Sequence, residues 1–376
     1  MAPKRTQHYP PLDYRAGQVR LITFQKATAG AIRGRLHVFP ISQCPEYLAV
    51  SYTWGEEPPR RTVYLNNNKI RIRENIYQAL KVIVRMRNRH SIQDNGWKSP
   101  KMLQGLIQEV AECQYFWIDS LCINQASVQE RNHQVGLMRQ IFSNARSVIA
   151  WLGPESENSS RVMKTINEYQ PQAAPVALSF MPLRMPEDVR AALLILQALP
   201  YWRRLWIVQE IILARNILLL WGEDGMCWNQ LANICLGCGL DIGPQGRMVT
   251  AEYAEQNINE RSEGWIKLVM RKKKIEAYLK GSSRQKTEGG DIKSPSLYAL
   301  IMEFSEQECR EPRDKVIGLL GLLFDEATEL GDYSVPLEEY YEMVCRYAFR
   351  TADIKGDWSK QRFQGCLRRS LGLPVS

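Results

Sequence analysis

Several features that would place a chain in a special class are missing from this sequence. No apolar run reaches the ~20 residues that a membrane-spanning helix needs, and no apolar segment follows the basic N-terminal residues, as it would in a secretory signal. The glycine-rich phosphate-binding motifs of P-loop proteins and classical dehydrogenases are absent, and so is any histidine-rich metal motif. We therefore expect a cytoplasmic protein without a membrane segment, and kinase or dehydrogenase chemistry has no motif to support it.

Cysteine is present, but its pattern is not that of a disulfide framework. The 376-residue chain contains 9 cysteines, scattered along its length and odd in number. Cys235 and Cys238 form the one close pair, with Cys227 nearby and no histidine in that stretch. A structural zinc site uses four closely spaced ligands. We therefore expect reduced structural thiols, no metal and no resident cofactor.

Positive charge is in excess, and much of it lies in one segment. The formal net charge is +9, and residues 271–290 hold seven basic and two acidic residues together with glycine and serine. A basic surface can bind nucleic acid, but no recognisable binding module or stripe of basic and aromatic residues accompanies it. We interpret the region near 272–293 as a mobile, solvated loop and expect no nucleic-acid binding.

The N-terminal part of the chain alternates strand and helix patterns. Short runs rich in apolar, β-branched and aromatic residues, typical of buried strands, occupy residues 48–54, 115–122 and 147–153. Residues 62–72 form two alternating segments joined by asparagines, which predicts a hairpin followed by a helix. Strands separated by helices predict an α/β fold with a parallel or mixed sheet flanked by helices.

The remainder of the chain is expected to add helices to this core. Residues 201–214 are apolar nearly all the way round at helical spacing, which indicates a buried helix. We assign 18–222 to the α/β core and 223–350 to a helical extension packed on it. Residues 351–376 carry little periodicity and are predicted to be a poorly ordered tail.

The segment FWIDSLCINQASVQERN (residues 116–132) is the most informative one. A buried strand ends at Asp119, and a loop containing Asn124 and Gln125 leads into a helix that begins near Ser127. Ligands of open α/β sheets bind beyond the carboxyl ends of the strands. This loop is therefore a candidate site.

Two charged residues, Glu130 and Arg131, fall inside or at the edge of the apolar face of that helix. A charge on such a face is costly unless it is paired, so we expect a polar cluster with Asp119 as one partner. Two interpretations of Glu130 stay open. It is either a functional carboxylate or the glutamate of a capping box begun by Ser127. Arg131 with Asp119 is equally compatible with a structural ion pair.

Polar and aromatic groups also gather at the end of the 48–54 strand, in Ser51, Tyr52, Trp54 and Gly55. A tryptophan there can stack on a nucleotide base, or it can simply pack at the rim of the core. In the 201–214 helix, Arg203 and Glu210 share one side, and their network is either architectural or lines a pocket.

Together, these segments resemble the fungal heterokaryon-incompatibility (HET) domain. Four blocks follow in the order and rough spacing of that family: YLAVSYTWG, FWIDSLCINQ, ERNHQVGLM and IFSNARSVIAWLG. Two later blocks, YWRRLWIVQEIILA and CREPRDKVIGLLGL, resemble those that follow in the same fungal proteins. The resemblance spans about residues 18–350 and implies nonself recognition at hyphal fusion, with cell death as the outcome.

HET domains are in turn similar, at a distance, to TIR domains, which have a flavodoxin-like α/β fold and in several lineages cleave NAD. By this resemblance SYTWG matches the first TIR strand and its loop, and Glu130 falls near the TIR catalytic glutamate. The tryptophan–cysteine pair before that glutamate has no clear equivalent here, CINQ being the nearest segment. Cleavage at nicotinamide releases a neutral leaving group, so one carboxylate beside the oxocarbenium-like transition state would suffice.

Two functions follow from these resemblances. The first is an incompatibility effector that triggers cell death by hydrolysing NAD, with Glu130 as the catalytic residue. The residues expected to bind NAD or a related nucleotide are Ser51, Tyr52, Trp54, Gly55, Asp119, Asn124, Gln125 and Arg131. The alternative is a non-enzymatic signalling module that self-associates. For both functions we expect a homo-oligomer on activation and an incompatibility partner protein.

Overall fold

The computed structural model describes most of the chain, in two compact units. The described residues are 9–25, 31–89, 101–170, 185–237, 264–282, 295–323, 327–352 and 356–374. One unit comprises Met1–Tyr201 and Ala214–Ile258, and the other comprises Trp202–Leu213 and Asn259–Ser376. Residues 202–213 are thus grouped with the later helices, whereas the sequence pattern grouped them with the α/β core. None of the helices described is long and apolar enough to span a membrane.

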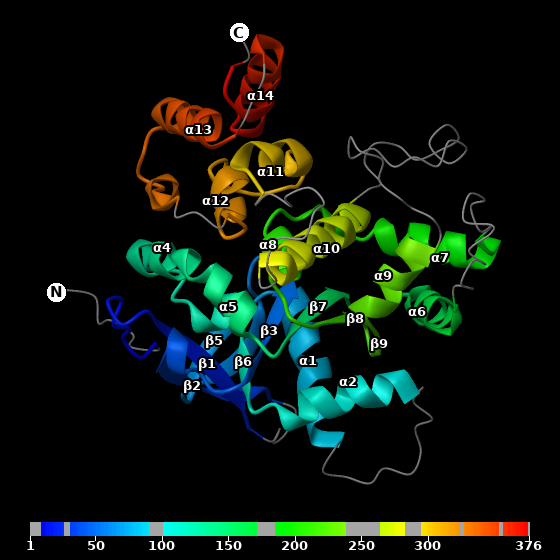
Figure 1. The fold of residues 1–376 in the computed structure, drawn as a ribbon. Coiled ribbons are helices and arrows are strands. Elements are labelled where there is room, and N and C mark those ends of the chain that lie inside the picture. The colour runs from blue at the N-terminus through cyan, green and yellow to red at the C-terminus, as the bar shows by residue number, and fades with distance from the viewer. Residues whose placement is uncertain are drawn as a thin grey trace, which may run out of the picture. The chain divides into compact units, whose positions relative to one another are not determined.

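The first unit is built on a nine-stranded mixed sheet, with the order β5-β4-β2-β1-β6-β3-β7-β8-β9 (Figure 1). Its strands are β1 (Gln18–Phe24), β2 (Arg33–Pro40), β3 (Tyr47–Tyr52), β4 (Arg61–Leu65), β5 (Asn68–Ile72), β6 (Tyr115–Trp117), β7 (Ser147–Gly153), β8 (Ile217–Trp221) and β9 (Asp224–Cys227). The α/β fold predicted from the alternating pattern is confirmed.

Four adjacent parallel strands form the centre of this sheet. β3 pairs in parallel with β6 on one side and with β7 on the other, and β7 pairs in parallel with β8. Numbered along the chain, these strands lie in the order 2-1-3-4, which is the doubly wound order of flavodoxin-like folds. The direction of winding reverses between β3 and β7, and sheets of this type bind ligands at such a switch point.

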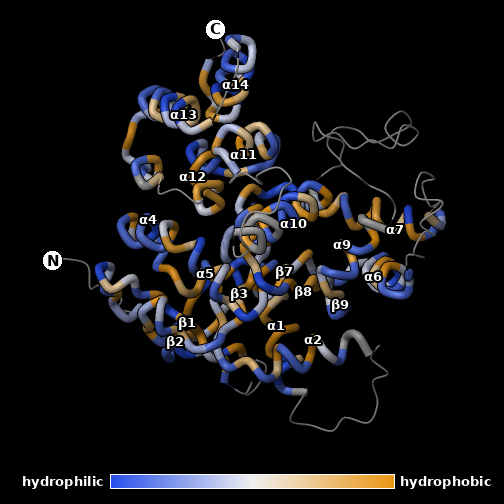
Figure 2. Tube along the Cα trace, in the orientation of Figure 1, coloured by the Kyte–Doolittle hydropathy of each residue, from blue (hydrophilic) through white to orange (hydrophobic). Residues whose placement is uncertain are grey.

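The central strands are apolar because helices cover both faces of the sheet. Every residue of β3 and β7 is buried. Figure 2 shows hydrophobic residues along these strands, and Figure 1 shows α4 and α5 on one face of the sheet and α1 and α2 on the other. The helices of this unit are α1 (Glu74–Arg89), α2 (Lys101–Glu112), α3 (Asp119–Cys122), α4 (Val128–Gly136), α5 (Met138–Asn144), α6 (Ser159–Glu168), α7 (Glu187–Gln197) and α9 (Trp228–Gly237), with a 3₁₀ turn at Ile41–Gln43.

The outer strands extend the parallel centre with antiparallel pairs, except that β2 and β4 are parallel. β1 pairs antiparallel with β2 and with β6, and the sequence analysis identified neither β1 nor β2. The hairpin expected at residues 62–72 is present as β4–β5. Its turn has positive φ at Asn66 (50°) and Asn67 (66°), the conformation that a two-residue hairpin turn requires and that asparagine tolerates. The helix expected from Ser127 onward is divided at Leu137 into α4 and α5.

The second unit is mainly helical in its described residues. It contains α8 (Ile207–Ile212), α10 (Gly264–Ser282), α11 (Leu297–Phe304), α12 (Asp314–Leu320), a 3₁₀ turn at Thr328–Gly331, α13 (Leu337–Thr351) and α14 (Asp357–Ser370). A further 3₁₀ turn, Pro200–Arg203, lies where the chain passes from one unit to the other. In this unit Glu210 lies 4.0 Å from Arg204, and the side-chain amide of Gln209 donates to the Ile317 carbonyl at 3.3 Å. These contacts connect α8 to Arg204 and to α12, whereas Arg203, the other expected member of this network, is exposed.

Two expectations for the C-terminal part need correction. The segment predicted to be a poorly ordered tail contains α14, in which Phe363, Cys366 and Leu367 are buried at helical spacing. Phe363 also stacks on Tyr298, with ring centroids 5.0 Å apart. Charged residues surround these three positions, so the helical period of the apolar residues is weak in the sequence.

The stretch 272–293, predicted to be a mobile loop, begins as part of helix α10, and its residues 283–293 lie outside the described ones. Lys272 is only 5 % exposed. Its ammonium donates to the Ile212 carbonyl at 3.3 Å and lies 3.4 Å from Glu276. Burial lowers the pKa of Lys272. This lysine therefore belongs to the packed interior of the unit, whereas Lys273 and Lys274 are exposed.

Replacing Lys272 should destabilise the second unit. Lys272→Ala removes a buried stem and leaves the Ile212 carbonyl without this donor, so we expect the free energy of unfolding to fall by about 1–3 kcal/mol. The control Lys273→Ala removes the neighbouring exposed charge and should change it by less than about 0.5 kcal/mol. Urea denaturation measures both values. Equal stability of the two variants would contradict the packing of Lys272.

Candidate functional site

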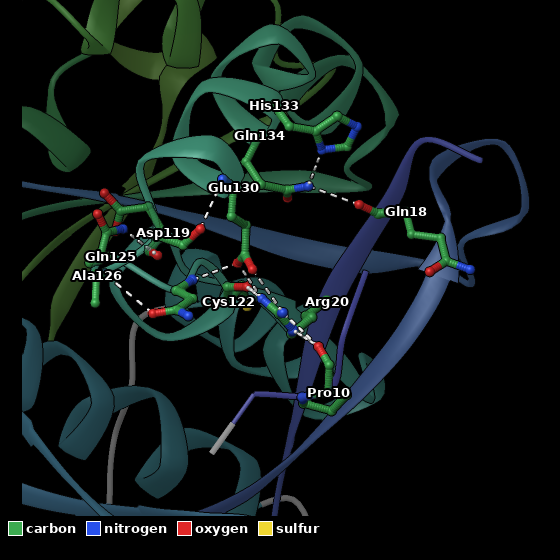
Figure 3. Close-up of polar contacts among 12 residues, drawn as sticks. Pro10, Gln18, Arg20, Asp119, Cys122, Gln125, Ala126, Glu130, His133 and Gln134 are labelled. Atoms are coloured by element: carbon green, nitrogen blue, oxygen red, sulfur yellow. Dashed lines mark hydrogen bonds and ion pairs between the residues drawn. The ribbon is translucent and has the colours of Figure 1, made fainter. Parts of the chain in front are cut away.

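Glu130, the predicted catalytic residue, is held in a buried ion pair. It lies in the first turn of α4 and is 4 % exposed. The guanidinium of Arg20 on β1 donates to both carboxylate oxygens, at 2.5 Å and 3.1 Å (Figure 3). The Asn124 backbone N–H donates to the same carboxylate at 2.6 Å. The partner of Glu130 is thus Arg20, and not Asp119 as the sequence led us to expect.

Arg20 is 1 % exposed, and its hydrogen-bonding capacity is filled. Besides the two bonds to Glu130, it donates to the Cys122 carbonyl at 3.0 Å and twice to the Pro10 carbonyl, at 2.8 and 2.6 Å. These five bonds use all five N–H donors of a guanidinium. The Tyr9 ring lies 5.0 Å from the guanidinium carbon, and burial raises the pKa of Tyr9 to about 12. The whole group therefore ties together the N-terminal segment, β1, the loop after Cys122 and α4.

Only one of the two hydrogen bonds of the capping box predicted at the start of α4 is present. The Ser127 hydroxyl accepts from the Glu130 backbone N–H at 3.2 Å, as in a capping box. The Glu130 carboxylate, however, turns to Arg20 and Asn124. Farther along α4, the buried Gln134 side chain donates to the Gln18 carbonyl on β1 at 2.8 Å. The polar residues on the inner face of α4 thus attach this helix to β1.

A second cluster brings together Asp119, Tyr52 and Trp54, three residues that the sequence analysis proposed for the site. The Tyr52 hydroxyl donates to one oxygen of the Asp119 carboxylate at 2.8 Å, and the Trp54 indole N–H donates to the other at 2.6 Å. The Ser120 backbone N–H adds a bond of 2.6 Å. Asp119 therefore fixes two aromatic side chains of the neighbouring segment: Tyr52 is the last residue of β3, and Trp54 lies just after it.

The other predicted site residues take different places. Ser51 is buried and shares a 2.6 Å hydrogen bond with the Tyr201 hydroxyl. Asn124 accepts from the Ala126 backbone N–H at 3.2 Å, and Gln125 donates to the Asp119 carbonyl at 3.0 Å, so both shape the loop itself (Figure 3). Arg131 is exposed on α4.

The cysteine of this loop is not poised for nucleophilic chemistry. Cys122 is fully buried, and burial raises its pKa to about 12, so the thiol stays protonated. The described part of the chain contains no group of three or more histidine, cysteine or acidic side chains arranged to hold a metal ion. The side chains of Cys235 and Cys238 lie outside the described residues.

A pocket of about 510 Å³ lies next to the Asp119 cluster, at the carboxyl ends of β3, β7 and β8. Trp54 and Gly55 line it after β3, and Leu152, Gly153 and Pro154 line it at the end of β7. It thus occupies the switch point of the doubly wound sheet. Neither Glu130 nor Asp119 is among the described residues that line it, so Trp54 is the link between the predicted cluster and the cavity.

Most of this pocket is lined by residues other than those predicted from the sequence. Its other lining residues come from the start of α1 and the residue before it, the β7–α6 loop, the segment before Tyr201 and β8, and include Arg73, Asn75, Gln78, Glu155, Leu199 and Trp221. A signal was available in the sequence, because Trp-Gly or Trp-Leu-Gly ends three apolar runs, at residues 54–55, 151–153 and 221–222.

Two comparisons with known proteins both find heterokaryon incompatibility proteins. Residues 47–210 match the family model described as heterokaryon incompatibility protein (HET). The chain is also similar to heterokaryon incompatibility protein 6, OR allele, of Neurospora crassa, with 30 % identity over 141 residues. That match covers 35 % of this chain and 18 % of the relative, so the chain spans under a fifth of its length. No solved structure matches the chain.

The Arg20–Glu130 pair makes a quantitative prediction for Glu130→Gln. Capping alone would predict a loss of at most about 1 kcal/mol. Because the variant leaves the buried Arg20 charge without its counter-ion, we expect the free energy of unfolding to fall by about 3–5 kcal/mol. Chemical denaturation followed by circular dichroism measures this loss.

Two variants serve as controls for that measurement. Ser127→Ala removes only the cap and should cost about 1 kcal/mol. Arg131→Gln changes an exposed charge next to Glu130 and should cost less than about 0.5 kcal/mol. A Glu130→Gln protein as stable as Arg131→Gln would show that the buried pair does not hold this region together.

Proposed function

We propose that this chain, in which residues 47–210 form a HET domain, acts in fungal nonself recognition and triggers cell death by hydrolysing NAD. The family match and the relative from Neurospora crassa support an incompatibility-related function. The finer proposal, cleavage of NAD, is supported chiefly by one observation: a pocket of about 510 Å³ at the switch point of a doubly wound sheet. Sheets of this topology bind nucleotides at that position.

One residue of the pocket, Trp54, suits the flat ring of a nucleotide. Trp54 lines the pocket and offers a flat ring for stacking, while its indole N–H is held by Asp119. Tyr52 holds the other oxygen of the same carboxylate. Asp119 is therefore a positioning residue, which sets the orientation of Trp54 without itself lining the cavity.

Hydrolysis of NAD requires few groups from the protein. The bond between nicotinamide and ribose C1′ breaks, and its electron pair goes to the ring nitrogen, so nicotinamide leaves as a neutral molecule. Water adds to C1′ and releases a proton to solvent, giving ADP-ribose. One carboxylate near the oxocarbenium-like transition state provides the main stabilisation. Glu130 is the carboxylate predicted from the resemblance to TIR domains, but Arg20 and Asn124 engage both of its oxygens.

A direct assay tests this function. Purified protein is incubated with NAD, both dilute and concentrated with a crowding agent, because activation is expected to need self-association. We expect nicotinamide release from the concentrated sample. Trp54→Ala removes the stacking ring and should lower kcat/KM by about tenfold or more, at about 1–3 kcal/mol per stacked base. Trp358→Ala is the matched control, since Trp358 is 69 % exposed in the other unit.

The same variants are then expressed in a fungal host to measure killing and cellular NAD. We expect cell killing to be accompanied by a loss of cellular NAD. Trp54→Ala should reduce the killing and the NAD loss, and Trp358→Ala should change neither. Killing by the parent protein without any loss of NAD would exclude NAD hydrolysis as the mechanism.

That last outcome would favour the second candidate, a non-enzymatic module that self-associates. One observation supports this alternative: the carboxylates of Glu130 and Asp119 both accept several hydrogen bonds from the protein itself. Such carboxylates stabilise a loop and two aromatic side chains without any reaction. Concentration-dependent assembly of the killing-competent protein, with NAD intact, would identify this function.

A further inference from the structure

Three adjacent parallel strands end in the same way. Trp54-Gly55 follows β3, Trp151-Leu152-Gly153 ends β7, and Trp221-Gly222 ends β8. The three glycines have φ values of 75°, 147° and 62°, a range that other residues adopt only with strain. Because β3, β7 and β8 are parallel neighbours, the three turns lie at one edge of the sheet. Glycine adopts these conformations without strain, so the chain can turn sharply at the end of all three strands.

Gly222 also brings the β7–α6 loop close to the end of β8. A Cβ atom on Gly222 would lie 2.8 Å from the Glu155 Cα atom, so no larger residue fits there without a shift of the backbone. The Gly222 N–H donates to the Gly153 carbonyl at 2.9 Å. These contacts fix the backbone of Glu155 at the pocket that it lines.

The pocket combines apolar walls with an acidic rim. Its apolar lining comes from Trp54, Leu152, Pro154, Leu199, Pro200 and Trp221. Its acidic lining comes from Glu56, Glu57, Glu74 and Glu155, and one arginine, Arg73, also lines it. A flat ring suits such walls, and an excess of carboxylates attracts cations and repels phosphates.

The charged side chains of the rim differ in the hydrogen bonds and ion pairs that they make with the protein. The Arg73 guanidinium donates to the carbonyls of Gly55 and Glu57, at 2.8 and 2.6 Å, and its central carbon lies 6.0 Å from the centroid of the Trp54 ring, so one face of that ring is already shared with a cation. Glu74 accepts from Arg61 at 2.5 Å and from Gln78 at 2.5 Å. Glu155 is exposed and makes no side-chain hydrogen bond or ion pair within the described residues. Its carboxylate is therefore available to a ligand.

We propose that this pocket binds a flat, positively charged nitrogen heteroaromatic ring of the pyridinium class, with the ring on Trp54 and its charge facing the Glu155 carboxylate. An aromatic face and a carboxylate both attract such a cation. The proposal rests on the function proposed above, since the nicotinamide end of NAD carries this ring. The acidic rim keeps the pyrophosphate of NAD outside the pocket.

This placement gives Glu155 a catalytic role that the sequence analysis assigned to Glu130. As the bond from C1′ to the ring nitrogen breaks, its electron pair neutralises the ring, and positive charge moves to the ribose. The Glu155 carboxylate stabilises that charge, water bonds to C1′, and the proton of the water passes to solvent. The ring leaves as neutral nicotinamide, which the acidic rim no longer holds by charge.

The test uses 1-methylnicotinamide, a pyridinium cation without ribose or phosphate, and neutral benzamide as its uncharged analogue. Isothermal titration calorimetry measures their binding to the full chain. Glu155→Gln should weaken binding of the cation about fivefold, the effect of one exposed charge pair, and leave benzamide unchanged. Leu199→Trp fills the pocket and should weaken both ligands by more than about tenfold, because it takes the space of the ring.

Glu157→Gln is the matched control, since Glu157 is exposed two residues away and does not line the pocket. It should bind both ligands like the parent protein. Circular dichroism confirms that each variant is folded before binding is measured. The proposal is overturned if Glu155→Gln and Glu157→Gln bind the cation equally, or if Leu199→Trp binds it like the parent.

An NAD-cleavage assay on the same variants separates this proposal from the proposed function. If cation binding depends on Glu155 but the parent protein does not cleave NAD, the proposed binding site is supported and the proposed enzymatic function is excluded. If the parent protein cleaves NAD and neither Glu155→Gln nor Leu199→Trp reduces the cleavage, the proposed function is supported and this pocket is excluded as its site. If both proposals hold, Glu155→Gln lowers kcat/KM for NAD by about fivefold, while Glu157→Gln does not.

Discussion

The buried ion pair between Arg20 and Glu130 is the interaction on which the arrangement of the site loop depends. Burying two charges is costly, and the cost is offset only when geometry and hydrogen bonding are nearly complete. Here the guanidinium uses all of its donors, and the carboxylate accepts from Arg20 twice and from Asn124. The pair joins β1 to α4 across 110 residues of sequence. The loop between Cys122 and Ser127 therefore has a fixed conformation.

This constraint extends from the ion pair toward the pocket. The same loop contains Gln125, whose side chain donates to the Asp119 carbonyl, and the Asp119 carboxylate in turn holds Tyr52 and Trp54. Trp54 is the member of this series that lines the pocket. The carboxylates of Glu130 and Asp119 thus hydrogen-bond to the protein itself, and neither residue is among the described ones that line the pocket.

The two alternatives considered for Glu130 show how far local reasoning extends. The capping motif was visible because it needs only residues three positions apart, and Ser127 does cap α4. The costly position of the charge on the helix face was also visible from the period of the apolar residues. Its partner was not, because Arg20 lies on a strand that the sequence analysis did not identify. The predictions for the segments of α14 and Lys272 were wrong for a related reason: charged residues surround a few buried ones in both segments.

The sequence by itself determined the alternation of strands and helices, the hairpin at residues 62–72, the start of α4 and the resemblance to the HET family. These features depend on the local period of apolar residues, on turn residues and on short blocks of sequence. Only the tertiary structure decided which strands are neighbours, that Glu130 meets Arg20, and that Trp54, Glu155 and Leu199 line one pocket. Strand order and contacts between distant segments depend on how the sheet is wound, and no local pattern encodes that winding.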